Sequence, residues 1–266
     1  MRRVAIVALA AMAGAALAQS EQLVPAFGAI ERGDYAQAID VLKPLAQGGD
    51  TEAQYLLATA LERAAPPLGD PAAAYGWYRR AAEAGHAPAQ VNLGAMHYDG
   101  RGGAEKSAKE AARWYRAAAE QGNVIAQTNL GLMYLEGAGV PRDPVEAERL
   151  IRAAASQGYA RAQAQLGRMY LDGDGVAADA TTALGWFERA AQQDHEGAQF
   201  FLALLYQKGI GTARDLERAL RWLERAAVRG HRLAMLELAR AYENGLGTVA
   251  DPEKARAWRA RAQAAK

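Results

Sequence analysis

The sequence contains no cysteine, which excludes several kinds of chemistry at once. Disulfide bonds cannot form, and no thiolate is available as a nucleophile or as a zinc ligand. Lipid attachment in the manner of a bacterial lipoprotein is also excluded, because it requires a cysteine after the signal. The stability of the fold must therefore come from packing and hydrogen bonding.

Serine and histidine are scarce, so the sequence offers few candidate nucleophiles or general bases for an enzyme. Ser20, Ser107 and Ser156 neither begin a Ser-x-x-Lys motif nor lie within Gly-x-Ser-x-Gly, two common settings of a serine nucleophile. The four histidines include no His-x-x-x-His pair, so no metal site is predicted. We therefore expect no catalytic residue, no metal and no cofactor.

An excess of positive charge is also missing. The chain has 31 Lys and Arg residues against 30 Asp and Glu residues. Nucleic acid binding is favoured by a strongly basic surface, so we do not expect a nucleic acid partner.

The first residues have the pattern of a secretory signal peptide. Arg2 and Arg3 precede an apolar run, Val4 to Ala15, that is too short to span a bilayer. Ala16-Leu17-Ala18 is a suitable cleavage site, so the mature chain would begin at Gln19. We expect residues 1–18 to be removed, a bacterial periplasmic location, and no membrane insertion afterwards. The alternative is an uncleaved anchor or a buried helix.

The rest of the chain is organised as a repeat of 36 or 37 residues. An alanine begins each copy and a leucine follows four residues later, as in Ala126 and Leu130. The alanines are Ala53, Ala89, Ala126, Ala162, Ala198 and Ala234. The apolar spacing predicts a helix, glycines such as Gly137 and Gly139 predict a turn, and a second helical pattern follows.

Each second helix begins with a recognisable cap. In the third copy Asp143 precedes Pro144, and an aspartate carboxylate can accept hydrogen bonds from the free amides of a first helical turn. Asp70, Asp179, Asp215 and Asp251 take this place in other copies, and Ser107 takes it in the second. All five tryptophans occupy one position of the second helix, where we expect them to be buried.

The repeated pattern resembles the Sel-1-like repeat, a relative of the tetratricopeptide repeat. The match is carried in the third copy by Leu130, Gly131, Tyr134, Gly137, Gly139, Val140, Asp143, Ala147, Ala154, Ala155 and Gly158. The resemblance implies an all-α fold, a right-handed α-solenoid of helix-loop-helix repeats. Six copies over residues 53–266 start near 53, 89, 126, 162, 198 and 234, and residues 19–52 form a tetratricopeptide-like capping helix pair.

In the tetratricopeptide family the first helix of each pair lines a concave groove that binds a partner. Transferred to this sequence, the partner-binding positions are Val91, Tyr98, Thr128, Leu132, Leu135, Arg168, Leu171, Phe200, Leu204, Gln207 and Arg240. Their mixture of apolar, aromatic and arginine side chains is typical of a protein-binding surface. The alternative is that several of these residues, the leucines above all, are core residues between neighbouring copies.

Three histidines and the paired glycines have structural interpretations. His86, His195 and His231 all follow a second helix, a turn position rather than a metal-binding pattern. Pairs such as Gly173 and Gly175 follow helices rather than strands, which indicates a turn and not a phosphate-binding loop.

We therefore expect a non-catalytic periplasmic scaffold or adaptor that binds a protein or peptide through the concave groove. Such a protein could regulate an envelope complex or a sensor. The alternative is a cell-envelope hydrolase or a factor that binds the cell wall polymer murein. The sequence leaves the partner's identity and the oligomeric state open.

Overall fold

The structure is a computed structural model that describes residues 21–265. All regular secondary structure in this range is helical, so the expected all-α repeat fold is confirmed. Residues 21–31 form a helix. The helices that follow are α2 (Tyr35–Gln47), α3 (Thr51–Arg63), α4 (Pro71–Glu83), α5 (Ala87–Asp99), α6 (Ala108–Glu120), α7 (Val124–Glu136), α8 (Pro144–Ser156), α9 (Ala160–Asp172), α10 (Ala180–Gln192), α11 (Glu196–Lys208), α12 (Leu216–Val228), α13 (Arg232–Asn244) and α14 (Pro252–Ala264).

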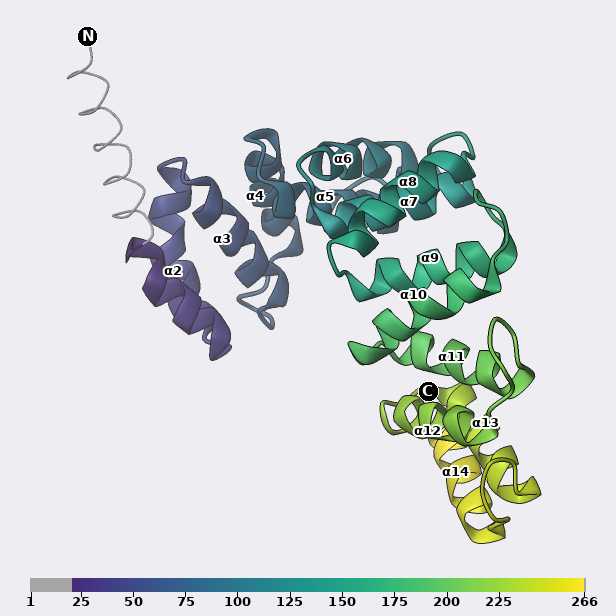
Figure 1. Cartoon of the computed structure of the whole chain (residues 1–266). Helices are drawn as coiled ribbons and strands as arrows, with labels where there is room; N and C mark the ends of the chain where they lie inside the picture. Colours follow the sequence, from purple (N-terminus) through teal and green to yellow (C-terminus); the bar gives the residue numbers. More distant parts are fainter. Residues whose placement is uncertain (1–20, 266) are drawn as a thin grey trace, which may run out of the picture. The chain divides into compact units, whose positions relative to one another are not determined.

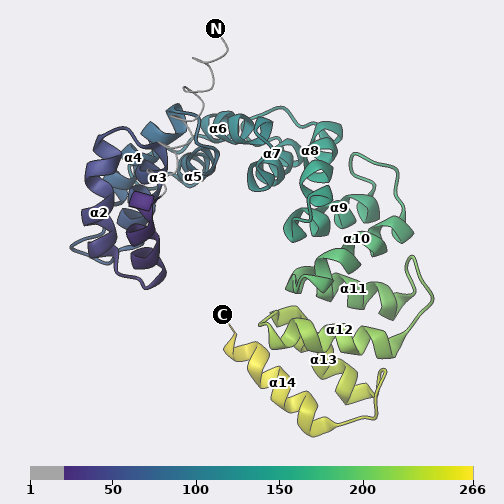
Figure 2. The same cartoon turned by 60° about the vertical axis from the view of Figure 1, so that its left-hand side comes forward.

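The chain divides into two compact units, residues 1–121 and residues 122–266. The first unit contains α2 to α6 and the second contains α7 to α14 (Figure 1). Inside each unit, every helix packs against the next one along the chain, as Figure 2 shows for α7 to α14. The predicted signal peptide, residues 1–18, lies outside the described residues. None of the described helices has the length and apolar character that a membrane crossing requires.

The predicted caps of the second helices are confirmed. Asp143 accepts hydrogen bonds from the backbone N–H groups of Val145 and Glu146 at 3.1 and 3.0 Å. The other predicted caps accept in the same way, and these are Asp70, Ser107, Asp179, Asp215 and Asp251. These bonds satisfy amides that a helix leaves without an internal partner, so the loop before each second helix ends at a fixed residue.

The expectation that every tryptophan is buried was wrong. Only Trp114 is buried, while the other four are partly exposed. Each partly exposed ring is covered on one side by an arginine three residues later, as Arg189 covers Trp186 at 4.5 Å from the ring centroid. One residue turns a helix by about 100°, so the following position points into the core instead. In five copies that position is buried and holds Tyr78, Tyr115, Ile151, Phe187 and Leu223, while the last copy has the exposed Arg259 there.

A buried glutamine ties each of several first helices to the second helices on both sides. Gln163 of α9 donates from Nε2 to the carbonyl oxygen of Ala155 in α8 at 3.2 Å. Gln193, just after α10, donates to Gln163 Oε1 at 2.8 Å. Gln90 and Gln121 repeat this arrangement in the first unit. The amide pairs both of its polar ends, which is what a buried polar group needs.

Two copies lack the second contact of this arrangement. The Oε1 atoms of Gln54 and Gln199 are buried without a hydrogen-bond partner among the described residues. Ala84 stands where a glutamine would reach Gln54, and it has no side-chain donor. Arg229 stands at the corresponding place near Gln199, but it pairs with Asp194. An unpaired buried oxygen costs free energy, so both sites are places where the fold can be improved.

We expect Ala84→Gln to raise the free energy of unfolding by about 1 kcal/mol, because it supplies the missing donor to Gln54 Oε1. Ala84 follows α4 with φ −79° and ψ 3°, close to the φ −84° and ψ 4° of Gln121. Chemical denaturation followed by circular dichroism would measure the gain. Ala84→Glu is the matched control, since an ionised carboxylate has the same length but no donor. An equal gain in both variants would rule out the hydrogen bond as the cause.

Candidate functional site

The first-helix face is the surface that the first helices of the copies present, which in the second unit are α7, α9, α11 and α13. The predicted groove residues differ widely in exposure on this face. Tyr98, Arg168 and Arg240 are exposed, with Tyr98 at 39%. The partly exposed residues are Leu132, Leu135, Leu171, Leu204 and Gln207, and the buried ones are Val91, Thr128 and Phe200. Tyr98 belongs to the first unit, and the other exposed or partly exposed groove residues all belong to the second unit.

Burial removes three of the predicted positions from the accessible surface. Thr128 is 1% exposed, and its hydroxyl donates to the carbonyl oxygen of Val124 at 2.7 Å. Phe200 stacks on the ring of His231, with ring centroids 4.6 Å apart. Val91 occupies the same position of its own copy and is 8% exposed. This position, two residues before the repeated leucine, therefore packs inside the fold rather than facing a partner.

The two predicted arginines of the second unit have different surroundings. Arg240 forms an ion pair with Glu237 at 3.1 Å, so its charge is largely balanced. Arg168 has no hydrogen-bond or ion-pair partner among residues 21–265, and the same holds for Arg161 two turns earlier on α9. An unpaired guanidinium presents five N–H donors to solvent or to an incoming acceptor. Arg161 and Arg168 are therefore the cations best placed to receive an anionic group.

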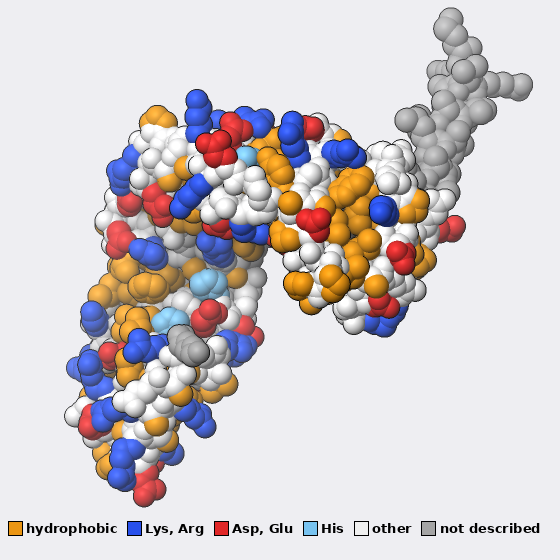
Figure 3. Space-filling view, turned by 180° about the vertical axis from the view of Figure 1, so that it is seen from behind, with side chains coloured by type: hydrophobic (Ala, Val, Ile, Leu, Met, Phe, Trp, Pro, Cys, Tyr) orange, Lys and Arg blue, Asp and Glu red, His pale blue; other side chains and the backbone are white. Residues whose placement is uncertain are grey.

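Both arginines line a pocket between α9 and α11, which we call the α9–α11 pocket. Its volume is about 220 Å³. The lining residues are Arg161, Ala164, Gln165, Arg168, Phe187, His195, Gly197 and Phe201. Phe187 and Phe201 stack with their ring centroids 5.3 Å apart. The pocket thus combines aromatic walls with two cationic side chains. Figure 3 shows histidine side chains among hydrophobic and basic ones on the second unit.

Three histidines are helix caps, a role that the sequence analysis missed. His195 Nδ1 accepts a hydrogen bond from the backbone N–H of Ala198 at 3.0 Å, at the start of α11. His86 and His231 cap α5 and α13 in the same way. The equivalent residue Asn123 caps α7 through its side-chain oxygen. The shared position of asparagine and histidine was the signal that could have revealed this role.

The cap made by His231 predicts a loss of stability in mild acid. Burial lowers the pKa of His231 from its ordinary value of 6.5, with the charge of His195 acting in the same direction and that of Glu196 opposing it. Below pH 6.5 the unfolded chain therefore binds more protons than the folded chain, and the free energy of unfolding falls as the pH drops through this range. Denaturation at a series of pH values would measure the slope.

His231→Asn is the matched control, because asparagine is the natural cap at Asn123 and does not titrate. We expect a shallower loss of stability below pH 6.5 in this variant. An unchanged slope would assign the acid sensitivity to other groups.

A larger cleft of about 570 Å³ lies between α10 and α12 on the second-helix side. Its charged groups are mostly engaged with each other. Tyr206 donates to Glu188 at 2.9 Å, Arg218 pairs with Asp215 at 3.1 Å, and Arg225 lies over the Trp222 ring. The mixture of signs gives no clear charge preference to this cleft. We therefore place the candidate site in the smaller α9–α11 pocket.

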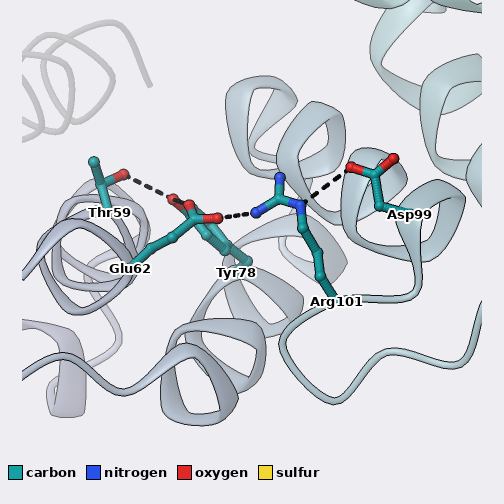
Figure 4. Close-up of polar contacts among 5 residues, drawn as sticks. All are labelled: Thr59, Glu62, Tyr78, Asp99 and Arg101. Carbon is teal, nitrogen blue, oxygen red and sulfur yellow. Dashed lines mark hydrogen bonds and ion pairs between the residues drawn. The ribbon is translucent and has the colours of Figure 1, made fainter. Parts of the chain in front are cut away.

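The first unit contains a chain of polar contacts that has the composition of a catalytic site (Figure 4). The hydroxyl of Tyr78, a fully buried side chain, donates to Glu62 Oε2 at 2.9 Å and lies 3.1 Å from the Thr59 hydroxyl. Arg101 pairs with Glu62 and with Asp99. Burial, as the main cause, raises the pKa of Tyr78 well above its ordinary value. The phenol stays protonated, so these contacts join α3, α4 and the loop after α5 rather than form a base.

Among the described residues, no group of three or more His, Cys, Asp or Glu side chains could hold a metal ion. Ser107 serves as the cap of α6, and Ser156 is exposed at the end of α8.

Comparison with known families identifies the repeat. The Sel1 repeat profile matches residues 51–86, 87–123, 124–159, 160–195, 197–231 and 232–262. These segments cover most of the sequence, so the chain belongs to the Sel1 repeat family. Sel1 repeat proteins generally act as protein-interaction scaffolds, and the family is typically non-catalytic. Comparison with curated proteins gives no match.

Two solved structures are similar over most of the chain. A Sel1 repeat protein from Oxalobacter formigenes shares 34% sequence identity over 91% of this chain and 96% of its own, with a TM-score of 0.83. A protective antigen of uropathogenic Escherichia coli strains with an SLR fold also shares 34% identity, over 85% of this chain, with a TM-score of 0.78. This chain covers only 48% of that antigen's length.

Proposed function

We propose that this protein is a non-catalytic scaffold that binds a protein or peptide through the first-helix face of its second unit. The observation that carries the proposal is the α9–α11 pocket, where the unpaired Arg161 and Arg168 stand beside the stacked rings of Phe187 and Phe201. Arginine and aromatic side chains dominate binding energy at protein interfaces. Leu171 and Leu204, both partly exposed, extend the apolar surface beyond the pocket.

We further propose that the protein works in the bacterial periplasm after removal of residues 1–18. The proposal rests on the Arg2-Arg3 pair, the short apolar run and the Ala16-Leu17-Ala18 cleavage site. N-terminal sequencing of the protein from a periplasmic fraction should give Gln19 as the first residue. A chain that still begins at Met1 would contradict export with cleavage.

Site-directed photo-crosslinking would test which face binds. A photoreactive residue would replace Leu135, Leu171 or Gln207 on the first-helix face, one at a time, in the native host. The control position is Arg221, an exposed residue of the α10–α12 cleft. We expect the three test positions to yield the same partner adduct, identified by mass spectrometry, and the control to yield none.

Two outcomes would contradict this function. Adducts from Arg221 alone would move the binding site to the second-helix side. Retention of the protein on purified murein, with no protein adduct from any position, would favour the cell-wall factor instead.

A further inference from the structure

We propose that the α9–α11 pocket takes a peptide segment of the partner in which an aromatic residue stands next to a carboxylate. This inference rests on the proposed binding function and adds the chemistry of the ligand. At the equivalent place in the first unit, side chains of the protein itself fill the space that is open in the α9–α11 pocket.

The filled equivalent lies in the first unit, at the cap of α5. The ring of His86 packs against the ring of Tyr55, with centroids 4.8 Å apart. Its Nε2 atom lies 2.9 Å from Glu52 Oε2, while Nδ1 accepts from the N–H of Ala89. Because Nδ1 is an acceptor, the ring proton is on Nε2 and is donated to the carboxylate. A cap histidine at this place is therefore satisfied by one aromatic ring and one carboxylate.

At His195 both of these groups are missing. Ala164 stands at the position of Tyr55, and Arg161 stands at the position of Glu52. Gly197, the second residue of α11, adds no side chain to the opposite wall. His195 Nδ1 caps α11 at 3.0 Å, so Nε2 carries the proton, and no partner for it is found within residues 21–265. The pocket is the space that a ring and a carboxylate occupy in the first unit.

The walls of the pocket favour the same two groups. Phe201 is partly exposed and stacks on the fully buried Phe187, so its ring offers an aromatic surface to an incoming ring. Arg161 and Arg168 are seven residues apart, about 10 Å along α9. Their guanidinium groups can therefore approach a carboxylate in the pocket from its two sides. The nearest acidic residue of α11, Glu196, is exposed, and its charge acts on His231. The local charge of the pocket is therefore positive.

The size of the pocket favours a side chain of a longer segment. Sites for small molecules generally measure about 300–1,000 Å³, and this pocket measures about 220 Å³. The surface continues along the first-helix face past Leu171 and Leu204. A peptide can place one aromatic side chain in the pocket and lay its neighbours along this surface.

Fluorescence anisotropy with the purified full chain would test the proposal. The probe is a fluorescein-labelled hexapeptide with one Phe followed by one Glu among Gly and Ser. We expect its affinity to fall at least about tenfold when Phe is replaced by Ala, or Glu by Gln. Arg168→Gln should weaken binding by a similar factor, while Arg221→Gln, on the second-helix side, should leave it within about twofold.

A variant that fills the pocket gives a second readout. Arg161→Glu combined with Ala164→Tyr rebuilds the arrangement of Glu52 and Tyr55 around His195. We expect peptide binding to be lost and the melting temperature to rise by roughly 2–4 °C, because the chain then satisfies the cap histidine by itself. Loss of binding without loss of the helical circular dichroism signal confirms that the space was the site.

Three results would overturn the proposal, and a fourth would overturn only the scaffold function. Equal affinity for all three peptides would remove the ring and the carboxylate from recognition. Phenylacetate competing as well as the peptide would assign the pocket to a small acid. If crosslinks still form on the first-helix face but no peptide binds, the scaffold function stands and the ligand chemistry is wrong. If the peptide binds but no crosslinks form on this face, the pocket is real and the scaffold function fails.

Discussion

Phe187→Ala is expected to reduce the free energy of unfolding by about 3–5 kcal/mol, the usual cost of truncating a large aromatic side chain in a core. Phe187 is fully buried and stacks on Phe201. A Cβ added at Gly167 would lie only 3.1 Å from the Phe187 ring, which shows how closely α9 approaches it. Removing the ring leaves a cavity that the two helices cannot close without moving.

The neighbouring Trp186→Ala provides the comparison. Trp186 is the larger side chain, but it is partly exposed and one of its faces is covered only by Arg189. We expect it to cost about 1–3 kcal/mol, because less apolar area leaves contact with water on folding. Denaturation with guanidinium, followed by circular dichroism, would measure both variants. Equal losses, or a larger loss for Trp186, would contradict the assignment of the core position to Phe187.

The tryptophan error shows what the sequence pattern could predict and what it could not. The helices, loops and caps follow from local signals, since apolar spacing, glycine and aspartate act within a few residues. Which of two adjacent positions faces the core depends on the neighbouring copy. The tryptophan repeated at one position drew attention, although four of the five are only partly buried, while the next position, buried in five copies, varies among Tyr, Ile, Phe and Leu. The packing between copies therefore determines which of the two positions faces the core, and the repeat pattern alone does not.

The candidate site was predictable only in part for a similar reason. The resemblance placed Arg168 on the first-helix face, where the structure finds it exposed. The same transfer placed Thr128 there, although this position is buried in its copy. The pocket itself arises from two absences, the missing side chains at Ala164 and Gly197, which belong to different copies. A pocket formed by small residues on two different helices cannot be predicted from the sequence before the packing of those helices is known.

In three of the loops the second glycine carries a packing constraint beyond turn formation. Gly175 has φ +80°, a conformation that costs an L-residue about 1–2 kcal/mol. A Cβ on Gly175 would also collide with the carbonyl group of Pro144, the first residue of α8, and would lie 2.6 Å from its carbon. Gly211 and Gly247 meet Ala180 and Leu216 in the same way. The loop of one copy therefore rests directly on the start of the second helix of the copy before it.

Gly175→Ala is accordingly expected to cost about 2–5 kcal/mol, since the strain of the turn is added to an overpacked backbone contact. Gly158→Ala separates the two causes, because Gly158 has φ +90° but nothing within 4 Å of an added Cβ. That control should lose only the cost of the turn, about 1–2 kcal/mol. Chemical denaturation of both variants measures the difference. A difference near zero would mean that the loop can lift away from α8 freely, and that the paired glycines serve the turn alone.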